Sequence, residues 1–152
     1  MTARTRYLSC LRASVCDVFP YRTEREKIRR HIVDWIIYRK YWDKDDSIER
    51  LSVDFGIPRE EVTEFLYEKT GCRYLSIRKE LRLEDAEELL LCRKDLNIYD
   101  IARMVGFTDK SNFRREFSEA VGLKPAEWRE CNGNRKTVRV SCLSGAGRSH
   151  SL

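Results

Sequence analysis

Five polar residues in the last third of the chain carry groups that can hydrogen-bond to the edges of DNA bases. They are Lys110, Ser111, Asn112, Arg114 and Arg115. Arginine and lysine pair with guanine O6 and N7, asparagine pairs with adenine N6 and N7, and each good bidentate pair contributes about 1–3 kcal/mol of discrimination. A solvated helix face can have the same composition, so the elements around these residues must decide between the two interpretations.

The segment around these residues has the pattern of two short helices joined by a tight turn. After Asn97, a typical helix N-cap, apolar residues recur at the spacing of one helical face, and Gly106 then ends the helix. A second helix, beginning at Thr108 or Asp109, turns its phenylalanines inward and leaves the five polar residues largely outside. Such a pair, with donors on the free face of the second helix, is typical of a DNA-binding helix-turn-helix.

The stretch from residue 101 to residue 129 closely resembles the second helix-turn-helix of the AraC/XylS-type transcription regulators. The positions that match the pattern of that family are Ile101, Ala102, Val105, Gly106, Phe107, Asp109, Ser111, Phe113, Arg115, Phe117, Gly122, Pro125, Trp128 and Arg129. So many matches over one span are far more specific than a single short motif. The resemblance implies a DNA-binding transcription regulator, which activates genes more often than it represses them.

A unit with the same layout precedes this one by about fifty residues. Its expected helices cover residues 23–42, 47–55 and 58–71, with Asp46 predicted to open the second of them. This unit and the helix after it also resemble the AraC/XylS family, but more loosely. The matching positions are Gly56, Ile57, Gly71, Leu81, Arg82, Ala86, Leu89 and Leu90, and the departures are Glu64, Tyr74 and Ile77.

The reading helix of this first unit is acidic. Glu64 stands where the family usually has a basic reading residue, and residues 47–71 hold three basic and six acidic side chains. Arg59 and Thr63 are its obvious candidates for DNA contacts. Because acidic groups that face phosphate reduce the attraction for DNA, we expect this unit to add little affinity or to contact something other than DNA.

Between the units, residues 74–93 form a predicted linker helix with two apolar strips on nearly opposite sides. One strip holds Tyr74, Ile77 and Leu81, and the other holds Leu75, Leu83, Ala86 and Leu90. A helix of twenty residues is roughly 30 Å long, close to the ~34 Å between successive major-groove faces. One monomer could thus place both reading helices in neighbouring grooves, whereas a merely buried core helix would pack the same way without that spacing.

Basic residues are concentrated at the two ends of the chain. The net charge is +5, with eight Lys/Arg against three Asp/Glu in residues 1–30 and four against none in residues 131–152, which leaves the middle at −4. We expect residues 1–22 to form a basic flexible arm and residues 131–152 a disordered basic tail. An acidic middle repels phosphate, so a local arrangement or the basic ends must supply the attraction for DNA.

Several other classes of function lack support in the sequence. Six cysteines show no C-x-x-C pair and neither histidine lies near one at metal-ligand spacing, so we expect no metal and no cofactor. We find no nucleophile with a paired histidine and no phosphate-cradling glycine loop, so we expect no enzyme and no catalytic residues. No apolar stretch reaches the roughly 18 residues of a membrane span, and reduced cysteines fit a cytoplasmic protein.

We therefore predict an all-α protein with two helix-turn-helix subdomains joined by a long linker helix, homeodomain-like and AraC-type. The first unit covers about residues 23–71, the linker 74–93 and the second unit 97–130. The predicted function is sequence-specific binding of double-stranded DNA by a transcription regulator that reads mainly with the second recognition helix. The alternative is a protein-interaction module of the same fold, in which the acidic first recognition helix binds a partner such as RNA polymerase or another regulator. The sequence leaves the oligomeric state open.

Overall fold

The computed structural model of the chain describes residues 1–12 and 23–133, and this part of the chain contains helices and no strand. In order, the elements are α1 (Ala3–Cys10), α2 (Glu24–Ile37), the 3-10 helix η1 (Lys40–Trp42), α3 (Ile48–Phe55), α4 (Arg59–Thr70), α5 (Tyr74–Cys92), α6 (Ile98–Met104), α7 (Lys110–Val121) and α8 (Pro125–Gly133). The predicted all-α class, with two helix-turn-helix units on one long helix, is confirmed.

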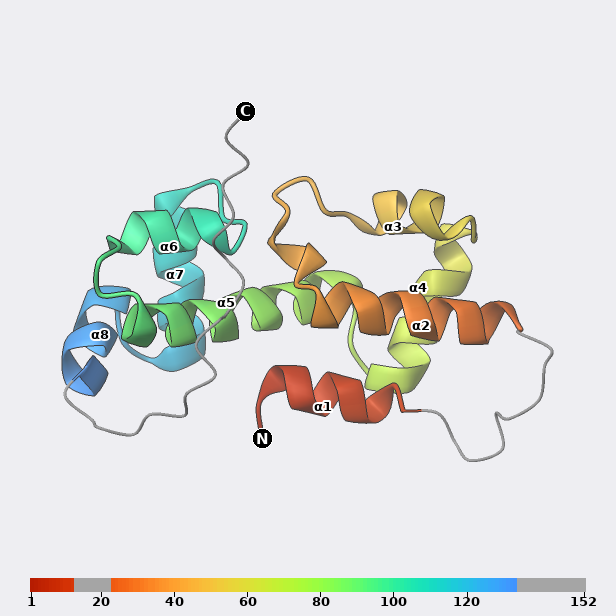
Figure 1. Cartoon of the computed structure of the whole chain (residues 1–152), viewed down its shortest axis with the longest axis horizontal. Coiled ribbons are helices and arrows are strands. Elements are labelled where there is room, and N and C mark those ends of the chain that lie inside the picture. Colours follow the sequence, from red (N-terminus) through yellow and green to blue (C-terminus); the bar gives the residue numbers. More distant parts are fainter. Residues whose placement is uncertain (13–22, 134–152) are drawn as a thin grey trace.

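The long helix α5 is the axis of the molecule, with α3 and α4 toward one end and α6, α7 and α8 around the other (Figure 1). Two hydrophobic cores form along it: the first includes Tyr74, Ile77 and Leu81, and the second includes Leu83, Ala86 and Leu90. The two apolar strips therefore pack on two separate bodies, as the sequence predicts. Leu75 is an exception, because its side chain is 64% exposed.

Helix α8 closes the second core. The ring of Trp128 meets Phe117 of α7 edge to face, with centroids 6.1 Å apart. Next to it, the Nε of Arg129 donates a hydrogen bond of 3.2 Å to the backbone carbonyl of Leu90, near the end of α5. This contact satisfies one of the carbonyls that the end of a helix leaves without an internal partner. The Trp-Arg pair thus fixes α8 against both α5 and α7.

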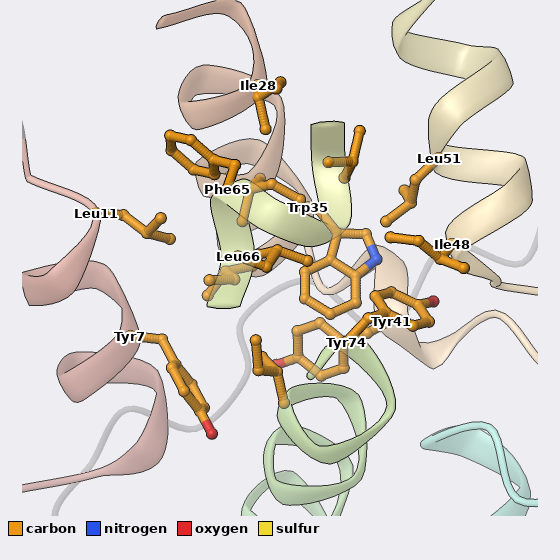
Figure 2. Close-up of a cluster of buried hydrophobic side chains, with 14 of the residues drawn as sticks. Tyr7, Leu11, Ile28, Trp35, Tyr41, Ile48, Leu51, Phe65, Leu66 and Tyr74 are labelled. Carbon is orange, nitrogen blue, oxygen red and sulfur yellow. The ribbon is translucent and has the colours of Figure 1, made fainter. Parts of the chain in front are cut away.

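The first core corrects the prediction of a flexible arm over residues 1–22. Residues 3–10 form helix α1, and Tyr7 and the following Leu11 are each only 1% exposed. Figure 2 shows both side chains pointing toward the cluster that Trp35 and Phe65 form with other residues of the first unit. Composition alone suggested a solvated segment, but burial of two large side chains offsets the entropy of ordering a short helix.

Capping residues determine where several helices begin. The side chain of Thr23 accepts the backbone N–H of Glu26 at the start of α2, and Asn97 does the same for Asp100 at the start of α6. Helix α3 is capped by Ser47 rather than by Asp46. The sequence prediction at that position was wrong in detail, although the helix itself is where we expected it.

Asp46 has a different role, as a buried hydrogen-bond acceptor in the first core. Its carboxylate accepts the indole N–H of Trp35 at 3.1 Å and the hydroxyl of Tyr74. Burial raises the pKa of Asp46 above its ordinary value, because the charged form is partly removed from water. These bonds tie the turn before α3 to α2 and to the first turn of α5.

The terminal predictions fall partly outside the described residues. Within the predicted disordered tail, residues 131–133 complete α8. The rest of that tail, residues 134–152, and the second half of the predicted arm, residues 13–22, lie outside the described part of the chain.

Candidate nucleic-acid interface

Helix α7 presents the predicted reading residues on one free surface. Phe113 and Phe117 are buried in the second core, at 1% and 0% exposure. On the other side of the helix Lys110, Ser111, Arg114 and Arg115 are exposed and Asn112 is half-buried. The structure therefore brings all five predicted residues of the second unit together along the first six residues of one helix.

The start of α7 is fixed by Asp109, one of the two predicted caps. Its carboxylate accepts the backbone N–H of Ser111 at 3.0 Å and of Asn112 at 3.2 Å. A carboxylate at this position also interacts favourably with the positive end of the helix dipole. The cap gives a defined geometry to the turn that carries most of the reading residues.

One hydrogen bond orients a guanidinium on this surface. The Nη2 of Arg115 donates to the side-chain oxygen of Asn112, three residues earlier, at 2.6 Å. The bond spans neighbouring turns of the helix and restricts a long side chain that would otherwise sample many rotamers. The planar fork of Arg115 is thereby held near the exposed surface of α7.

The two predicted residues of the first unit lie on α4, near the other end of α5 (Figure 1). Arg59 and Thr63 are both exposed, but each has a local partner. Arg59 forms an ion pair with Glu49 of α3 at 3.1 Å, and the hydroxyl of Thr63 donates to the backbone carbonyl of Arg59 at 2.8 Å. The structure therefore does not bring them together with the α7 residues.

A basic hollow of about 430 Å³ separates the two units. Its polar lining includes Lys44, Ser76, Arg78, Lys79, Thr108 and Asn112, and Glu116 is the carboxylate among its described lining residues. The sequence analysis missed this cluster, because its members come from a loop, from α5 and from the start of α7. Positive charge gathers in this hollow, because its lining holds Lys44, Arg78, Lys79 and Arg82 against one carboxylate among the described residues.

Arg82 joins the two units beside this hollow. Its guanidinium donates to three backbone carbonyls: those of Tyr41 at 2.6 Å, Asp43 at 2.8 Å and Gly106 at 3.1 Å. Tyr41 belongs to η1 and Asp43 follows it in the loop before α3, whereas Gly106 belongs to the turn of the second unit. Burial lowers the pKa of Arg82 to about 10, so the group is still cationic at neutral pH.

Asp85 holds the same loop from the next turn of α5. Its carboxylate is 1% exposed and accepts the hydroxyl of Tyr41 at 2.6 Å and the indole N–H of Trp42 at 2.7 Å. The ring of Trp42 packs against both hydrophobic cores. Arg82, Asp85 and Trp42 thus form a junction between the units, of which the sequence showed only Arg82, as a match to the family pattern.

The described residues offer few other sites for chemistry. No group of three or more potential metal ligands occurs in residues 1–12 and 23–133. In the same ranges no helix has the length and apolarity required to cross a bilayer. Cys10, Cys72 and Cys131 are free thiols.

Two helix-turn-helix units held by one long helix, with exposed basic side chains on the second helix of the second unit, define a bipartite helix-turn-helix protein. Residues 51–130 match the sequence model of a helix-turn-helix domain family that corresponds to the AraC type. This match covers more than half of the chain. The chain therefore belongs to the AraC-type helix-turn-helix family of DNA-binding transcription regulators.

Two curated relatives have regulator names. The chain is 27% identical over 106 residues to the "probable transcription factor PqrA" of Proteus vulgaris, a match that covers 69% of this chain and 85% of that protein. It is 41% identical over 54 residues to the "ornithine utilization regulator" of Pseudomonas aeruginosa, covering 36% of this chain. In that second relative the matched part is 14% of the whole protein, so the chain corresponds to a small part of its length.

Solved structures share the same fold. The C-terminal domain of AraT, a response regulator from Geobacillus stearothermophilus, superposes with a TM-score of 0.65 at 21% identity, covering 77% of this chain and 94% of that one. A DNA-binding transcriptional dual regulator from Escherichia coli K-12 superposes with a TM-score of 0.60 at 19% identity, covering 78% and 97%. At these identities the likeness concerns the fold alone.

Proposed function

We propose that this protein regulates transcription by reading a DNA sequence in the major groove, mainly through α7. The observation that carries the proposal is the first half of α7, where four exposed donors and Asn112 surround the solvent-facing side while the phenylalanines are buried. A helix of this length fits the major groove, which is about 12 Å wide, and its N-terminal residues then face the base edges.

The individual contacts follow from the side-chain chemistry. Arg115 is already oriented by Asn112, so it loses less conformational freedom when it pairs with guanine O6 and N7. Lys110 and Arg114, four residues apart, lie together on a neighbouring side of α7 and can reach bases or flanking phosphates. Ser111 donates or accepts according to the base that it meets.

The hollow between the units would receive the DNA backbone. Lys44 and Lys79 are exposed cations from the first unit's loop and from α5, and both line the hollow beside Asn112. A duplex that places its major groove on α7 brings phosphates toward these lysines. Such contacts fix the register of the protein and add affinity without adding sequence specificity.

The second candidate function is a protein interaction through the first unit, with RNA polymerase or another regulator as the partner. The surface of α4 favours it, because Glu60, Glu61 and Glu64 are exposed and Tyr67 is 60% exposed beside them. In this case α7 still holds the DNA, and α4 faces a basic protein surface. Arg59 and Thr63 would then make at most minor contacts with DNA.

Selection from a pool of random duplex DNA, followed by affinity measurements on the enriched sequence, tests the proposal. We expect Arg115→Ala to weaken specific binding by about 1–3 kcal/mol and to relax the preference for one base pair. Glu64→Ala serves as the matched control on the other unit, and it should leave the affinity unchanged or strengthen it, since it removes a negative charge.

The outcomes separate the two candidates. An enriched motif together with a loss of affinity in Arg115→Ala supports reading by α7. Retention of DNA without any enriched motif, disappearing as the salt concentration rises, would indicate attraction by basic residues alone. The protein-interaction function would then be the better account of the fold.

A further inference from the structure

Helix α1, which lies before the residues 51–130 that match the family model, is tied to the linker helix α5 by a series of polar contacts. The carboxylate of Glu84 accepts the backbone N–H groups of Ala3 at 2.9 Å and Arg4 at 3.0 Å, and thereby caps the start of α1. Arg6 pairs with Glu80. These contacts place α1 in one defined orientation across α5.

Arg4 makes a contact of a different kind. Its Nη2 pairs with Asp85 and also donates to the hydroxyl of Tyr41 at 2.8 Å. Asp85 is almost fully buried, whereas Glu80, the partner of Arg6, is 41% exposed. Within α1, Arg4 therefore reaches the junction between the two units, and Arg6 stays at the surface.

The contacts of Asp85 connect this arginine to the second unit. Asp85 holds Tyr41 and Trp42, whose backbone lies directly against Gly106: the Trp42 carbonyl oxygen would be 2.6 Å from a Cβ placed on that glycine. Gly106 is in the turn that leads into α7. A continuous set of contacts thus runs from α1 through Asp85 and the loop to the turn before the reading helix.

We propose that α1 is a strut that sets the separation of α4 and α7, with Arg4 as its positioning residue. The inference rests on the proposed function and adds one premise, that Arg59 and Thr63, both exposed on α4, contact the same duplex that α7 reads. A buried carboxylate needs a charged partner, and after loss of Arg4 the longer contact with Arg39, at 3.4 Å, is the ion pair of Asp85 that remains among the described residues. The loop is then held less firmly, and the two units can adopt several separations.

The test uses the full chain and the sequence enriched by the selection described above, with single base pairs inserted or removed between the parts that contact α4 and α7. Each insertion moves one part by about 3.4 Å along the duplex. The wild-type chain should lose about ten-fold in affinity for a one-base-pair change, comparable to a mismatch in the site. In Arg4→Met this penalty should fall to about two- to three-fold, while Arg4→Lys, which keeps the charge, should restore much of it.

Arg6→Met is the matched control, because it removes a guanidinium from the same helix without touching the junction. It should keep the wild-type spacing profile. A thermal unfolding measurement on each variant shows whether the first unit still folds. The test compares the affinities of one variant for different spacings, and this ratio stays the same if part of the protein is inactive.

Each outcome of these binding measurements either supports the strut or contradicts it. If Arg4→Met and Arg6→Met have the same spacing profile, or if the wild-type chain tolerates every spacing equally, the strut is wrong although α7 still reads DNA. If instead Arg115→Ala binds as tightly as the wild type, the proposed function itself fails. The two failures are therefore distinguishable in one set of measurements.

Discussion

Replacement of Gly106 by alanine tests the junction most directly. Gly106 has φ of +100°, which a residue with a side chain rarely adopts, and a Cβ there would lie 2.6 Å from the carbonyl oxygen of Trp42 and 2.8 Å from Cζ of Arg82. The first neighbour is backbone, and the second is fixed by its three hydrogen bonds to carbonyls. Neither can move aside without disrupting the contact between the two units.

The expected loss of stability follows from these two effects. A non-glycine residue in a sparsely populated backbone region costs about 1–3 kcal/mol, and overpacking a tight contact typically costs about 1–3 kcal/mol more. We therefore expect Gly106→Ala to lower the free energy of unfolding by about 2–6 kcal/mol. Gly122→Ala is the matched control: its φ is +81°, but nothing lies within 4 Å of the added Cβ, so only the backbone cost of about 1–2 kcal/mol applies.

Urea unfolding of both variants, followed by far-UV circular dichroism and by tryptophan fluorescence, measures the difference. Trp42 sits at the junction and packs against both cores, so its emission should change most in Gly106→Ala. If the two alanine variants unfold at the same urea concentration, the close approach at Gly106 does not contribute to stability. The tight contact between the units at this glycine would then be refuted.

Two further predictions concern single side chains, one in each unit. Asp109→Ala should lower the free energy of unfolding by about 1 kcal/mol, as loss of an N-cap usually does, whereas Thr108→Ala, the other candidate cap, should have little effect in the same urea titration. His31 stacks on Phe55 with ring centroids 4.6 Å apart, and burial holds the pKa of His31 below its ordinary 6.5. The folded chain thus favours the neutral ring, so this contribution to stability is complete above pH 6.5 and is lost as the pH falls through the folded-state pKa. The drop in urea midpoint between pH 7.5 and pH 5.5 should be smaller in His31→Gln, and an unchanged drop would contradict this assignment.

Much of the second unit was predictable because its signals are local. The N-cap at Asn97, the glycine after α6 and the spacing of the buried phenylalanines each act over one or two helical turns. The two strips of α5 follow from the same periodicity, which is why its division between two cores could be read from the sequence. The candidate reading residues are neighbours on one helix, so their grouping needed no knowledge of the tertiary fold.

The errors share a different physical cause. The order of α1 depends on Tyr7 and Leu11 finding a place in a core built from residues far along the chain. Asp46 is of a residue type that often caps helices. In the fold its carboxylate is buried instead, because it accepts hydrogen bonds from Trp35 and Tyr74, which are distant in sequence. In both cases a tertiary contact outweighed a local preference, and no pattern within a short window indicates such a contact.

The basic hollow and the junction could not be found for the same reason. Lys44 belongs to a turn rich in aspartate, and Lys79 belongs to a linker helix that also carries many acidic residues, so each reads as an ordinary surface charge. Only the packing of the loop against α5 and the turn before α7 brings them to one place. The mildly acidic middle of the chain is therefore not uniform, because four of its basic side chains gather between the units.

Because the junction fixes the two units relative to each other, the acidic face of α4 affects DNA binding in either candidate function. Because Arg82 and Asp85 fix the two units relative to each other, a duplex seated on α7 and the basic hollow passes at a set distance from Glu64. A flexible connection would let α4 move away from the phosphates, and the glutamates would then not reduce the affinity for DNA. With a fixed connection the repulsion is retained in the complex, so removal of the Glu64 charge should strengthen binding most at low salt, where screening is weakest. Under the second candidate function, an acidic face held in this way would leave the surface of α4 to a basic protein partner while α7 stays on its DNA site.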